Sequence, residues 1–523
     1  EHNMAHEWLN EAVFYEIYPQ SFNDTNADGI GDLQGIIEKL DYVKELGCNA
    51  LWLNPCFDSP FVDAGYDVRD FYKIAPRYGT NEDMRRLAQA VHDKGMHIIL
   101  DLVAGHTSTE CEWFKQSAKA EKNEYSDRYI WTRSVFEAPQ NVGSIKGWLR
   151  GGSDRDGSCA LNFFTAQVAL NYGFAKKDEG CEWQLDMNDE GPLATRQEIK
   201  NIMAFWLGMG IDGFRVDMAG SLVKNDEDGQ GTIAVWQDIT GYIKKEFPEA
   251  VLVSEWGDPE RALAGGFDMD FLLHFGPSHY PDLFRTDKPY FSSKGEGDLE
   301  IFWTNYLANR EKTKDGGGMI SLISGNHDMD RMARTLTPDE MRVAFAFLLS
   351  MPGVPFIYYG DELGMREVDV PHSVEGGYFR TGARSPMQWD TTTNAGFSSG
   401  RKEDLYIRID EDGYKTINAA YEMADETSLY HEVKNLIALR QTHPALGNRA
   451  ELNMVEYSDY PLIYERECAE ERILVIINPA GRSFKTNVNT DGEMIYTCMG
   501  KQLKHEGDET IIPGGSAFFI RKI

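Results

Sequence analysis

The residues best suited to chemistry in this chain are Arg215 and Asp217, in the stretch Gly-Phe-Arg-Val-Asp-Met-Ala at positions 213–219. The stretch completes a short apolar run that is typical of a buried strand, and side chains two residues apart lie on the same face of a strand. A guanidinium beside a carboxylate lowers the pKa of that carboxylate and keeps it ionised. An ionised Asp at a strand end can act as a covalent nucleophile, although an Arg-x-Asp pair taken alone is far more often an ordinary surface ion pair.

Other polar residues follow apolar runs in the same way. If the runs are parallel strands of one barrel, their carboxyl ends share one face and the side chains converge there. Four carboxylates, two histidines and one arginine at successive strand ends are difficult to explain as solvated surface. Besides the pair above, these residues are Asp101, His106, Glu255, His327 and Asp328.

Eight short apolar runs alternate with amphipathic helical stretches such as 33–46 and 194–209. This alternation predicts a closed (β/α)8 barrel. A doubly wound open sheet is the alternative, and no G-x-G-x-x-G follows the first run, which counts against a nucleotide-binding form of it. The predicted strands cover residues 13–18, 50–53, 97–103, 213–217, 251–255, 269–273, 319–324 and 355–358.

The barrel pattern is interrupted once and ends well before the C-terminus. Far more residues than one crossover helix requires separate the third and fourth predicted strands. Residues 104–190 are rich in Gly, Asn, Asp and aromatics, and they predict an inserted subdomain. Short strands with turn-rich joints at 446–523 predict an antiparallel β-sandwich. The barrel itself is then expected to comprise residues 1–103 and 191–445.

The composition excludes some kinds of partner. With 52 Lys and Arg against 84 Asp and Glu, the net charge is −32, which repels nucleic acid and anionic membranes. We expect a small neutral substrate, no nucleic-acid or membrane partner, and either a monomer or a dimer. Seven scattered cysteines without a C-x-x-C pair, and a first segment without the basic and apolar regions of a signal peptide, predict a cytoplasmic protein with reduced thiols.

Five motifs in this chain resemble those of the alpha-amylase family, glycoside hydrolase family 13. The resemblance extends over nearly the full length and implies the same barrel, insertion and C-terminal β-sandwich. The motifs read Asp-Leu-Val-Ala-Gly-His at 101–106, Gln-Leu-Asp-Met-Asn at 184–188, Gly-Phe-Arg-Val-Asp at 213–217, Val-Ser-Glu at 253–255 and Gly-Asn-His-Asp at 325–328.

The resemblance implies a retaining glycosidase with Asp217 as nucleophile, Glu255 as general acid/base and Asp328 as a third catalytic carboxylate. In such enzymes two carboxyl groups about 5–5.5 Å apart allow one to attack the anomeric carbon while the other protonates the leaving oxygen. Glu255 must begin protonated, so we expect burial and nearby negative charge to raise its pKa. The residues implied to orient the nucleophile and the sugar are His106, Arg215 and His327.

Two further segments resemble those of exo-acting members. Tyr66 matches a Tyr that stacks on the sugar in the cleaved subsite, where an aromatic face meets the apolar face of a pyranose. Arg384 matches an Arg that pairs with the Asp corresponding to Asp63 and closes the pocket behind the terminal sugar. A closed pocket predicts an exo-acting α-glucosidase that attacks the non-reducing end of short oligosaccharides, similar to oligo-1,6-glucosidases.

Several alternatives stay open on the same scaffold. A transglucosylase or a trehalose- or sucrose-converting isomerase differs only in what intercepts the covalent intermediate, while an endo-acting amylase or a non-catalytic amylase-like protein fits less well. Linkage preference is open because Met218 is neither the Val typical of α-1,6 preference nor the Thr or Ala of α-1,4 preference. Phe163, Phe164 and Tyr172 are interpreted as subdomain core in preference to acceptor-side platforms. Gly105 stands where the family usually has Asn, so no calcium site is expected at the first motif.

An oxygen-rich loop near the start predicts one structural Ca²⁺ or Mg²⁺ site. Hard oxygen ligands at alternating positions suit these cations, and exo-acting relatives bind them in a matching loop. The alternative is a polar turn whose last Asp caps the following helix. The expected ligands are Asp24, Asn26, Asp28, the carbonyl of Ile30, and Asp32.

Overall fold

Eight parallel strands form the central sheet of the computed structural model, which describes residues 4–457 and 459–523. Their order in the sheet is β13-β12-β11-β10-β5-β2-β1-β14, and Ile323, just after β13, bridges in parallel to Phe356 of β14. The sheet is therefore a nearly closed barrel, and the predicted (β/α)8 fold is confirmed. The strands are β1 (Phe14–Ile17), β2 (Ala50–Leu53), β5 (His97–Val103), β10 (Gly213–Asp217), β11 (Val251–Ser254), β12 (Met269–Phe271), β13 (Met319–Ser321) and β14 (Phe356–Tyr358).

Each barrel strand is short and largely buried, because strands of a parallel sheet are covered on both faces. Every residue of β10 and β11 is buried. The register of β10 places Arg215 opposite Asp101 of β5 on one side and Val253 of β11 on the other. The polar residues at the ends of these three strands are therefore level with one another.

The chain divides into two compact units, and each is described separately. The first comprises residues 1–51, 271–372 and 378–523, and the second comprises 52–270 and 373–377. In the first unit a capping box between Thr337 and Glu340 begins α10, since the two residues satisfy backbone N–H groups reciprocally. The helices of this unit are α1 (Leu33–Glu38), α2 (Leu40–Leu46), α8 (Pro281–Phe284), α9 (Glu300–Thr313), α10 (Pro338–Leu348), α11 (Ala419–Met423) and α12 (Leu429–Thr442).

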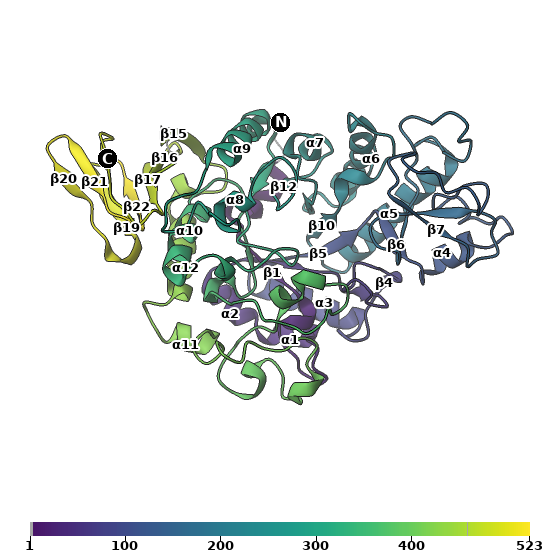
Figure 1. Ribbon diagram of the computed structural model, residues 1–523, viewed down its shortest axis with the longest axis horizontal. Helices are drawn as coiled ribbons and strands as arrows, with labels where there is room; N and C mark the ends of the chain where they lie inside the picture. Colours follow the sequence, from purple (N-terminus) through teal and green to yellow (C-terminus); the bar gives the residue numbers. More distant parts are fainter. Residues whose placement is uncertain (1–3, 458) are drawn as a thin grey trace. The chain divides into compact units, whose positions relative to one another are not determined.

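The C-terminal part of the first unit consists of two antiparallel sheets, as the sequence predicts. Figure 1 shows their strands gathered at the yellow end of the chain, where β17 and β22 pack against α10. The larger sheet has the order β15-β16-β17-β22-β19 and the smaller one β18-β21-β20. Their bounds are β15 (Glu451–Tyr457), β16 (Leu462–Glu467), β17 (Arg472–Asn478), β18 (Phe484–Thr486), β19 (Glu493–Thr497), β20 (Lys504–Glu506), β21 (Glu509–Ile512) and β22 (Ser516–Arg521).

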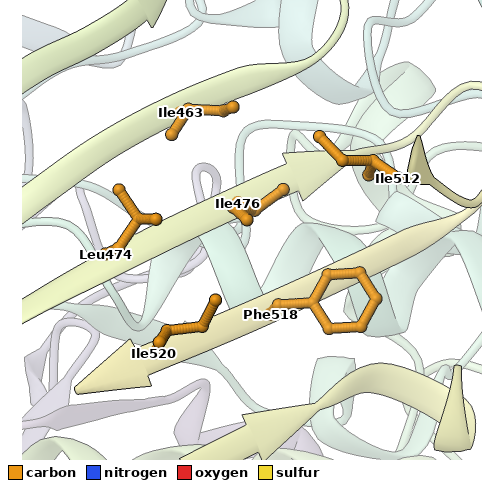
Figure 2. Packing of buried hydrophobic residues seen from close by; sticks show 6 residues of the cluster. All are labelled: Ile463, Leu474, Ile476, Ile512, Phe518 and Ile520. Carbon is orange, nitrogen blue, oxygen red and sulfur yellow. The ribbon is translucent and has the colours of Figure 1, made fainter. Parts of the chain in front are cut away.

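A buried apolar cluster holds the two C-terminal sheets together. Figure 2 shows Leu474 and Ile476 of β17 on one face of the larger sheet, beside Phe518 and Ile520 of β22. Ile512 from the smaller sheet completes the cluster. Alternate residues of β17 and β22 thus face the second sheet, while the residues between them are also buried, because α10 covers the other face.

The second unit carries the barrel strands β5, β10 and β11 and the segment inserted after β5. A capping box between Thr80 and Asp83 begins α3, and the insertion contains an antiparallel sheet of order β6-β9-β8-β7. The domain boundaries at 103/104, 190/191 and 445/446 stay predictions. The helices are α3 (Asn81–Asp93), α4 (Glu112–Ser117), α5 (Glu190–Gly208), α6 (Gln230–Glu246) and α7 (Pro259–Ala264), and the remaining strands are β3 (Phe57–Asp58), β4 (Asp70–Ile74), β6 (His106–Ser108), β7 (Gly147–Arg150), β8 (Ser158–Leu161) and β9 (Gln167–Ala169).

Within residues 4–457 and 459–523, none of the helices combines the length and the apolar character needed to cross a bilayer.

Candidate active site

The centre of the candidate site in the second unit is the guanidinium of Arg215, which is fully buried on β10. Its Nη1 donates to Oδ1 of Asp101 and to Oδ1 of Asp217, each at 3.0 Å, and its Nη2 donates to Oε2 of Glu255 at 2.6 Å. The planar fork of an Arg side chain suits several carboxylates at once. The structure therefore brings Asp217 and Glu255, which lie 38 positions apart in the chain, onto one cation.

Asp101 is a third carboxylate of this cluster, and the family resemblance implies no catalytic or orienting role for it. It lies on β5 and also accepts hydrogen bonds from Trp52 Nε1 at 3.2 Å and from the Tyr66 hydroxyl at 2.7 Å. Burial raises the pKa of Asp101 to about 6, although the Arg215 charge and the Tyr66 hydroxyl lower it. Asp101 thus links the guanidinium to Tyr66.

The backbone after Asp217 is strained in a way that serves Glu255. Met218 has φ 44° and ψ 45°, a left-handed conformation that costs free energy for any residue with a Cβ. In this conformation the Met218 N–H donates to Oε1 of Glu255 at 3.0 Å. Both carboxyl oxygens of Glu255 therefore have donors, Met218 on one side and Arg215 on the other. The raised pKa that is expected of Glu255 as a proton donor stays a prediction.

Asp63 and Tyr66 lie in the same unit as this cluster. Gln167 of β9 donates to Oδ2 of Asp63 at 2.6 Å. The segment 373–377 also belongs to this unit and is anchored by an ion pair of 2.8 Å between Arg77 and Glu375. A Cβ on Gly376 would lie 3.3 Å from Cα of Asp63, so the backbone of this segment covers Asp63 closely.

His106 is held by two hydrogen bonds that define its protonation. Its Nε2 lies 2.9 Å from the carbonyl oxygen of Tyr66, and its Nδ1 lies 2.8 Å from Nδ2 of Asn162. Because a carbonyl only accepts, Nε2 carries the proton and Nδ1 accepts from the amide. Burial lowers the pKa of His106 to about 4, so the ring is neutral. Asn162 also fills the space beside Gly105, where a Cβ would lie 2.9 Å from its Nδ2.

Asp328 lies in the first unit, where several cations surround it. Arg380 Nη1 is 2.5 Å and Arg384 Nη2 is 3.4 Å from its Oδ1, and His327 Nε2 is 3.2 Å from its Oδ2. Burial alone would raise the pKa of Asp328, but the charges of His327, Arg384 and Arg380 outweigh it and lower the pKa below its usual range. Asp328 is therefore ionised.

His327 and Arg384 support each other in this unit. His327 Nδ1 lies 2.9 Å from Oε2 of Glu16, and its ring stacks on Tyr18 with centroids 6.2 Å apart. Arg384 donates from Nε to the carbonyl of His327 at 2.8 Å and from Nη1 to the Tyr18 hydroxyl at 3.1 Å. The expected partner of Arg384, Asp63, lies in the other unit, so that pairing stays a prediction.

The oxygen-rich loop lies in the first unit, before α1. The amide nitrogen of Asn26 donates to Oδ1 of Asp24 and to Oδ1 of Asp28, each at 2.9 Å. Burial and the negative charges of Asp24 and Asp32 raise the pKa of Asp28, and the hydrogen bond from the Ile30 N–H partly offsets this rise. A raised pKa is expected where carboxylates lie close together.

The last Asp of this loop caps the following helix, as the alternative interpretation of the loop as a polar turn predicts. Asp32 accepts from the Gly35 N–H at 2.8 Å. In the described ranges no three His, Cys, Asp or Glu side chains form a metal site by themselves. A cation here would therefore also depend on the Asn26 amide and the Ile30 carbonyl, and these hard oxygen donors fit Ca²⁺ or Mg²⁺.

The aromatic residues of the insertion divide into two groups. Tyr172 is fully buried, and its hydroxyl donates to the carbonyl of Ala104, as expected for subdomain core. Phe163 is 60% exposed. Its ring packs edge-on against that of Phe164, with the ring centroids 4.6 Å apart. The core interpretation is therefore wrong for Phe163, because it lies in the loop between β8 and β9 and not on a strand.

Comparison with known proteins gives consistent results. A family model described as "Alpha amylase, catalytic domain" matches residues 16–448. An oligo-1,6-glucosidase of Bacillus sp. (strain F5) is 31% identical over 526 residues, which cover 88% of this chain and 96% of that protein. The trehalose synthase/amylase TreS of Mycolicibacterium smegmatis (strain ATCC 700084 / mc(2)155) is 32% identical over 488 residues, or 84% of this chain and 77% of that protein. The crystal structure of Bacillus licheniformis trehalose-6-phosphate hydrolase (TreA) matches with a TM-score of 0.82 and 26% identity, covering 98% of this chain and 99% of the other.

Proposed function

The chain belongs to the alpha-amylase family of glycoside hydrolases, and from this premise we propose that it is a retaining, exo-acting α-glucosidase. It removes glucose from the non-reducing end of short α-linked oligosaccharides through a covalent glucosyl intermediate on Asp217. The observation that carries the proposal is the arrangement of Asp217 and Glu255 on the single buried guanidinium of Arg215.

In the first step Asp217 attacks the anomeric carbon as the bond to the leaving oxygen breaks. Glu255 donates its proton to that oxygen, so the sugar that leaves carries a hydroxyl group. Arg215 keeps Asp217 ionised and ready to attack. In the second step Glu255 takes a proton from water, and the resulting hydroxide equivalent displaces Asp217 from the anomeric carbon with overall retention. Asp328, ionised by its cationic neighbours, is assigned to the hydroxyl groups of the sugar on the basis of the family motifs.

The exo assignment is supported by the surroundings of Asp63. Gln167 donates to Asp63, and the backbone of the segment 373–377 passes close to it, while Arg384 is assigned as its partner on the family pattern. Tyr66 is assigned as the stacking platform for the terminal glucose, with its hydroxyl fixed on Asp101. On these assignments, which follow the family pattern, the enzyme is expected to act on the end of a chain and not on its middle.

A second candidate is transfer of the glucosyl group to a sugar, as in a transglucosylase or an isomerase of trehalose or sucrose. Two observations favour it: the similarity to a trehalose synthase/amylase, and the exposed ring of Phe163, which can stack on an acceptor sugar. Both activities use Asp217 and Glu255 in the same first step.

We further propose that the loop 24–32 holds one structural Ca²⁺ or Mg²⁺. The ligands are Asp24, Asn26, Asp28, the carbonyl of Ile30, and Asp32. The cation would neutralise the carboxylates gathered in this loop, and it takes no part in the chemistry.

Activity of two variants tests the proposed function directly. Asp217→Asn removes the nucleophile and should lower kcat by about 10⁴-fold or more. Glu255→Gln removes the proton donor and should lower kcat/KM for oligosaccharides by about 10²- to 10⁴-fold. The matched controls are Asp287→Asn and Glu179→Gln, which change exposed side chains. Near-normal turnover in either active-site variant would overturn the assignment.

Products from maltose, isomaltose, panose, trehalose, sucrose and starch, followed by NMR, test exo action and the fate of the intermediate. We expect α-glucose from the small substrates and no attack on starch. Early maltooligosaccharides from starch would overturn the exo assignment. Conversion of trehalose or sucrose into an isomer without release of glucose would favour the second candidate.

A further inference from the structure

Asp270 is a buried carboxyl group that the proposed mechanism does not use. It lies on β12, next to β11, with Ser254 as its partner in the register. The side chain is fully buried, and it belongs to none of the five family motifs. It therefore requires another explanation.

All described hydrogen bonds of this carboxyl group go to the chain on either side of Glu255. Its Oδ1 accepts from the Ser254 hydroxyl at 2.9 Å, from the Trp256 N–H at 3.1 Å and from the Gly257 N–H at 3.3 Å. Ser254 directly precedes Glu255, and the two backbone donors directly follow it. One oxygen atom thus ties together the strand end and the turn that carry the proposed acid/base.

The backbone of Glu255 itself is held from the opposite direction. Its N–H donates to the carbonyl of Val216 at 2.9 Å, and its carbonyl accepts from the Ala219 N–H at 3.1 Å. Val216 and Ala219 flank the nucleophile, whereas Asp270 fixes the far side. With both sides fixed, the direction of the Glu255 side chain is defined relative to Asp217.

The burial of the Asp270 carboxyl group lowers the stability of the folded protein. No cation pairs with Asp270 among its described contacts, and its Oδ2 has no hydrogen-bond partner among residues 4–457 and 459–523. A buried carboxyl group that is only half hydrogen-bonded destabilises the folded state. Burial raises the pKa of Asp270 to about 7 despite the donors on Oδ1. A side chain that served packing alone would not need a carboxyl group at this position.

We propose that Asp270 is a positioning residue for Glu255, which it holds at the leaving oxygen through Ser254, Trp256 and Gly257. The inference rests on the proposed function. Without the Oδ1 acceptor, the turn after β11 loses its common anchor, and the Glu255 carboxyl group no longer stays within hydrogen-bond reach of the leaving oxygen. Such a loss affects proton donation, while nucleophilic attack by Asp217 is retained.

Two substrates separate these effects. Isomaltose or maltose, whichever the wild type prefers, needs full protonation of its leaving oxygen, whereas α-glucosyl fluoride loses a fluoride ion with little help from an acid. The parameter to compare is kcat/KM, because it reports the glucosylation step alone. In Asp270→Ala we expect kcat/KM for the disaccharide to fall about 100-fold and that for the fluoride to change by less than about threefold.

Asp270→Asn is the matched control, because the amide oxygen still accepts from the three donors. Its ratio of kcat/KM for the two substrates should equal that of the wild type. Asp270→Leu fills the space without an acceptor and should behave as Asp270→Ala does, which keeps the test available if the smaller side chain prevents folding. Circular dichroism and the melting temperature establish that each variant is folded.

The outcomes decide between positioning and packing. An equal loss on both substrates in the Ala or Leu variant would overturn the proposal, as would unchanged kinetics. Unfolding of both variants, with Asp270→Asn unaffected, would assign Asp270 to the stability of the barrel and would also overturn it. The wild type tests the proposed function separately, because failure to cleave either substrate refutes α-glucosidase activity without reference to Asp270.

Discussion

At the scale of single residues, Asn162 provides the side chain that the first motif lacks. Gly105 leaves room beside His106, and the amide of Asn162 enters that room from the loop after β8. There its Nδ2 lies 2.8 Å from Nδ1 of His106, which fixes the ring with its proton on Nε2. A residue 56 positions away in the chain thus orients a histidine that is implied to contact the sugar.

Gly105→Ala should disturb this arrangement although the added group is small. A Cβ at this position meets Asn162 Nδ2 at 2.9 Å, which is closer than side chains tolerate, so we expect a loss of stability of about 1–3 kcal/mol. The displaced amide also releases His106, so ¹⁵N NMR should show a mixture of ring tautomers, as it should in Asn162→Ala. Gly208→Ala, where a Cβ meets nothing within 4 Å, is the control and should not lower the melting temperature. An unchanged Nε2–H tautomer in both Gly105→Ala and Asn162→Ala would contradict this account.

At the scale of elements, hydrogen bonds of two Asp residues join the loop 24–32 to helix α1 and to a distant segment. Asp32 caps the helix through the Gly35 N–H, while Asp24 accepts from the Gly29 N–H at 2.8 Å and from the Ser398 hydroxyl at 2.7 Å. The loop thus connects the start of α1 to a distant segment of the same unit. A cation bound here would stabilise that connection.

Removal of divalent cations should therefore lower the melting temperature. A ligand that binds only the folded state, present at about 100 times its Kd, adds about 2.7 kcal/mol to the free energy of unfolding. EDTA should therefore lower the melting temperature by a few degrees, and added Ca²⁺ or Mg²⁺ should restore it. Asp28→Asn should abolish this dependence, and Asp412→Asn, which changes an exposed carboxylate, should not. Isothermal titration of the metal-stripped protein that shows no binding of either cation would refute the site.

At the scale of the whole molecule, buried acids add to the effect of a net charge of −32. Burial raises the pKa of Glu362 to about 7 and that of Glu422 to about 9. Both lie in the first unit, where Glu362 accepts from the Tyr15 hydroxyl at 2.8 Å and from the Tyr42 hydroxyl at 2.5 Å. Glu422 accepts from the Tyr430 N–H at 3.2 Å.

These shifts predict how stability depends on pH. A Glu in the unfolded chain loses its proton near pH 4.5, while Glu422 in the folded protein keeps its proton to about pH 9. Above pH 4.5 the folded state therefore binds more protons than the unfolded state, so stability falls as pH rises, by up to about 1.4 kcal/mol per pH unit for each such group. The repulsion of the net negative charge acts in the same direction.

We expect the melting temperature to be highest near pH 5 and to fall towards pH 9. Glu422→Gln removes one of the groups responsible and should make the decline shallower. Glu426→Gln, an exposed neighbour, is the control and should leave the slope unchanged. A melting temperature that rises between pH 5 and pH 9 would contradict the prediction.

The barrel, the C-terminal sheets and the family could all be predicted from the sequence, because each depends on patterns local to a short segment. A barrel strand such as 213–217 is a short buried segment, and its polar residues are visible in the same stretch. The pair of Arg215 and Asp217 could also be predicted, since the period of a strand fixes their relation without knowledge of any partner.

The contacts between these residues and groups far away in the sequence could not be predicted and are known from the tertiary structure. Strand register brings Asp101 and Glu255 to Arg215, and neighbouring strands bring Asp270 to the far side of Glu255. Arg380 reaches Asp328 from the short 3-10 helix Tyr378–Arg384, whose sequence carries no periodic signal. The physical reason is that a hydrogen bond needs atoms within about 3 Å, and such distances between remote segments are set by packing and loop geometry.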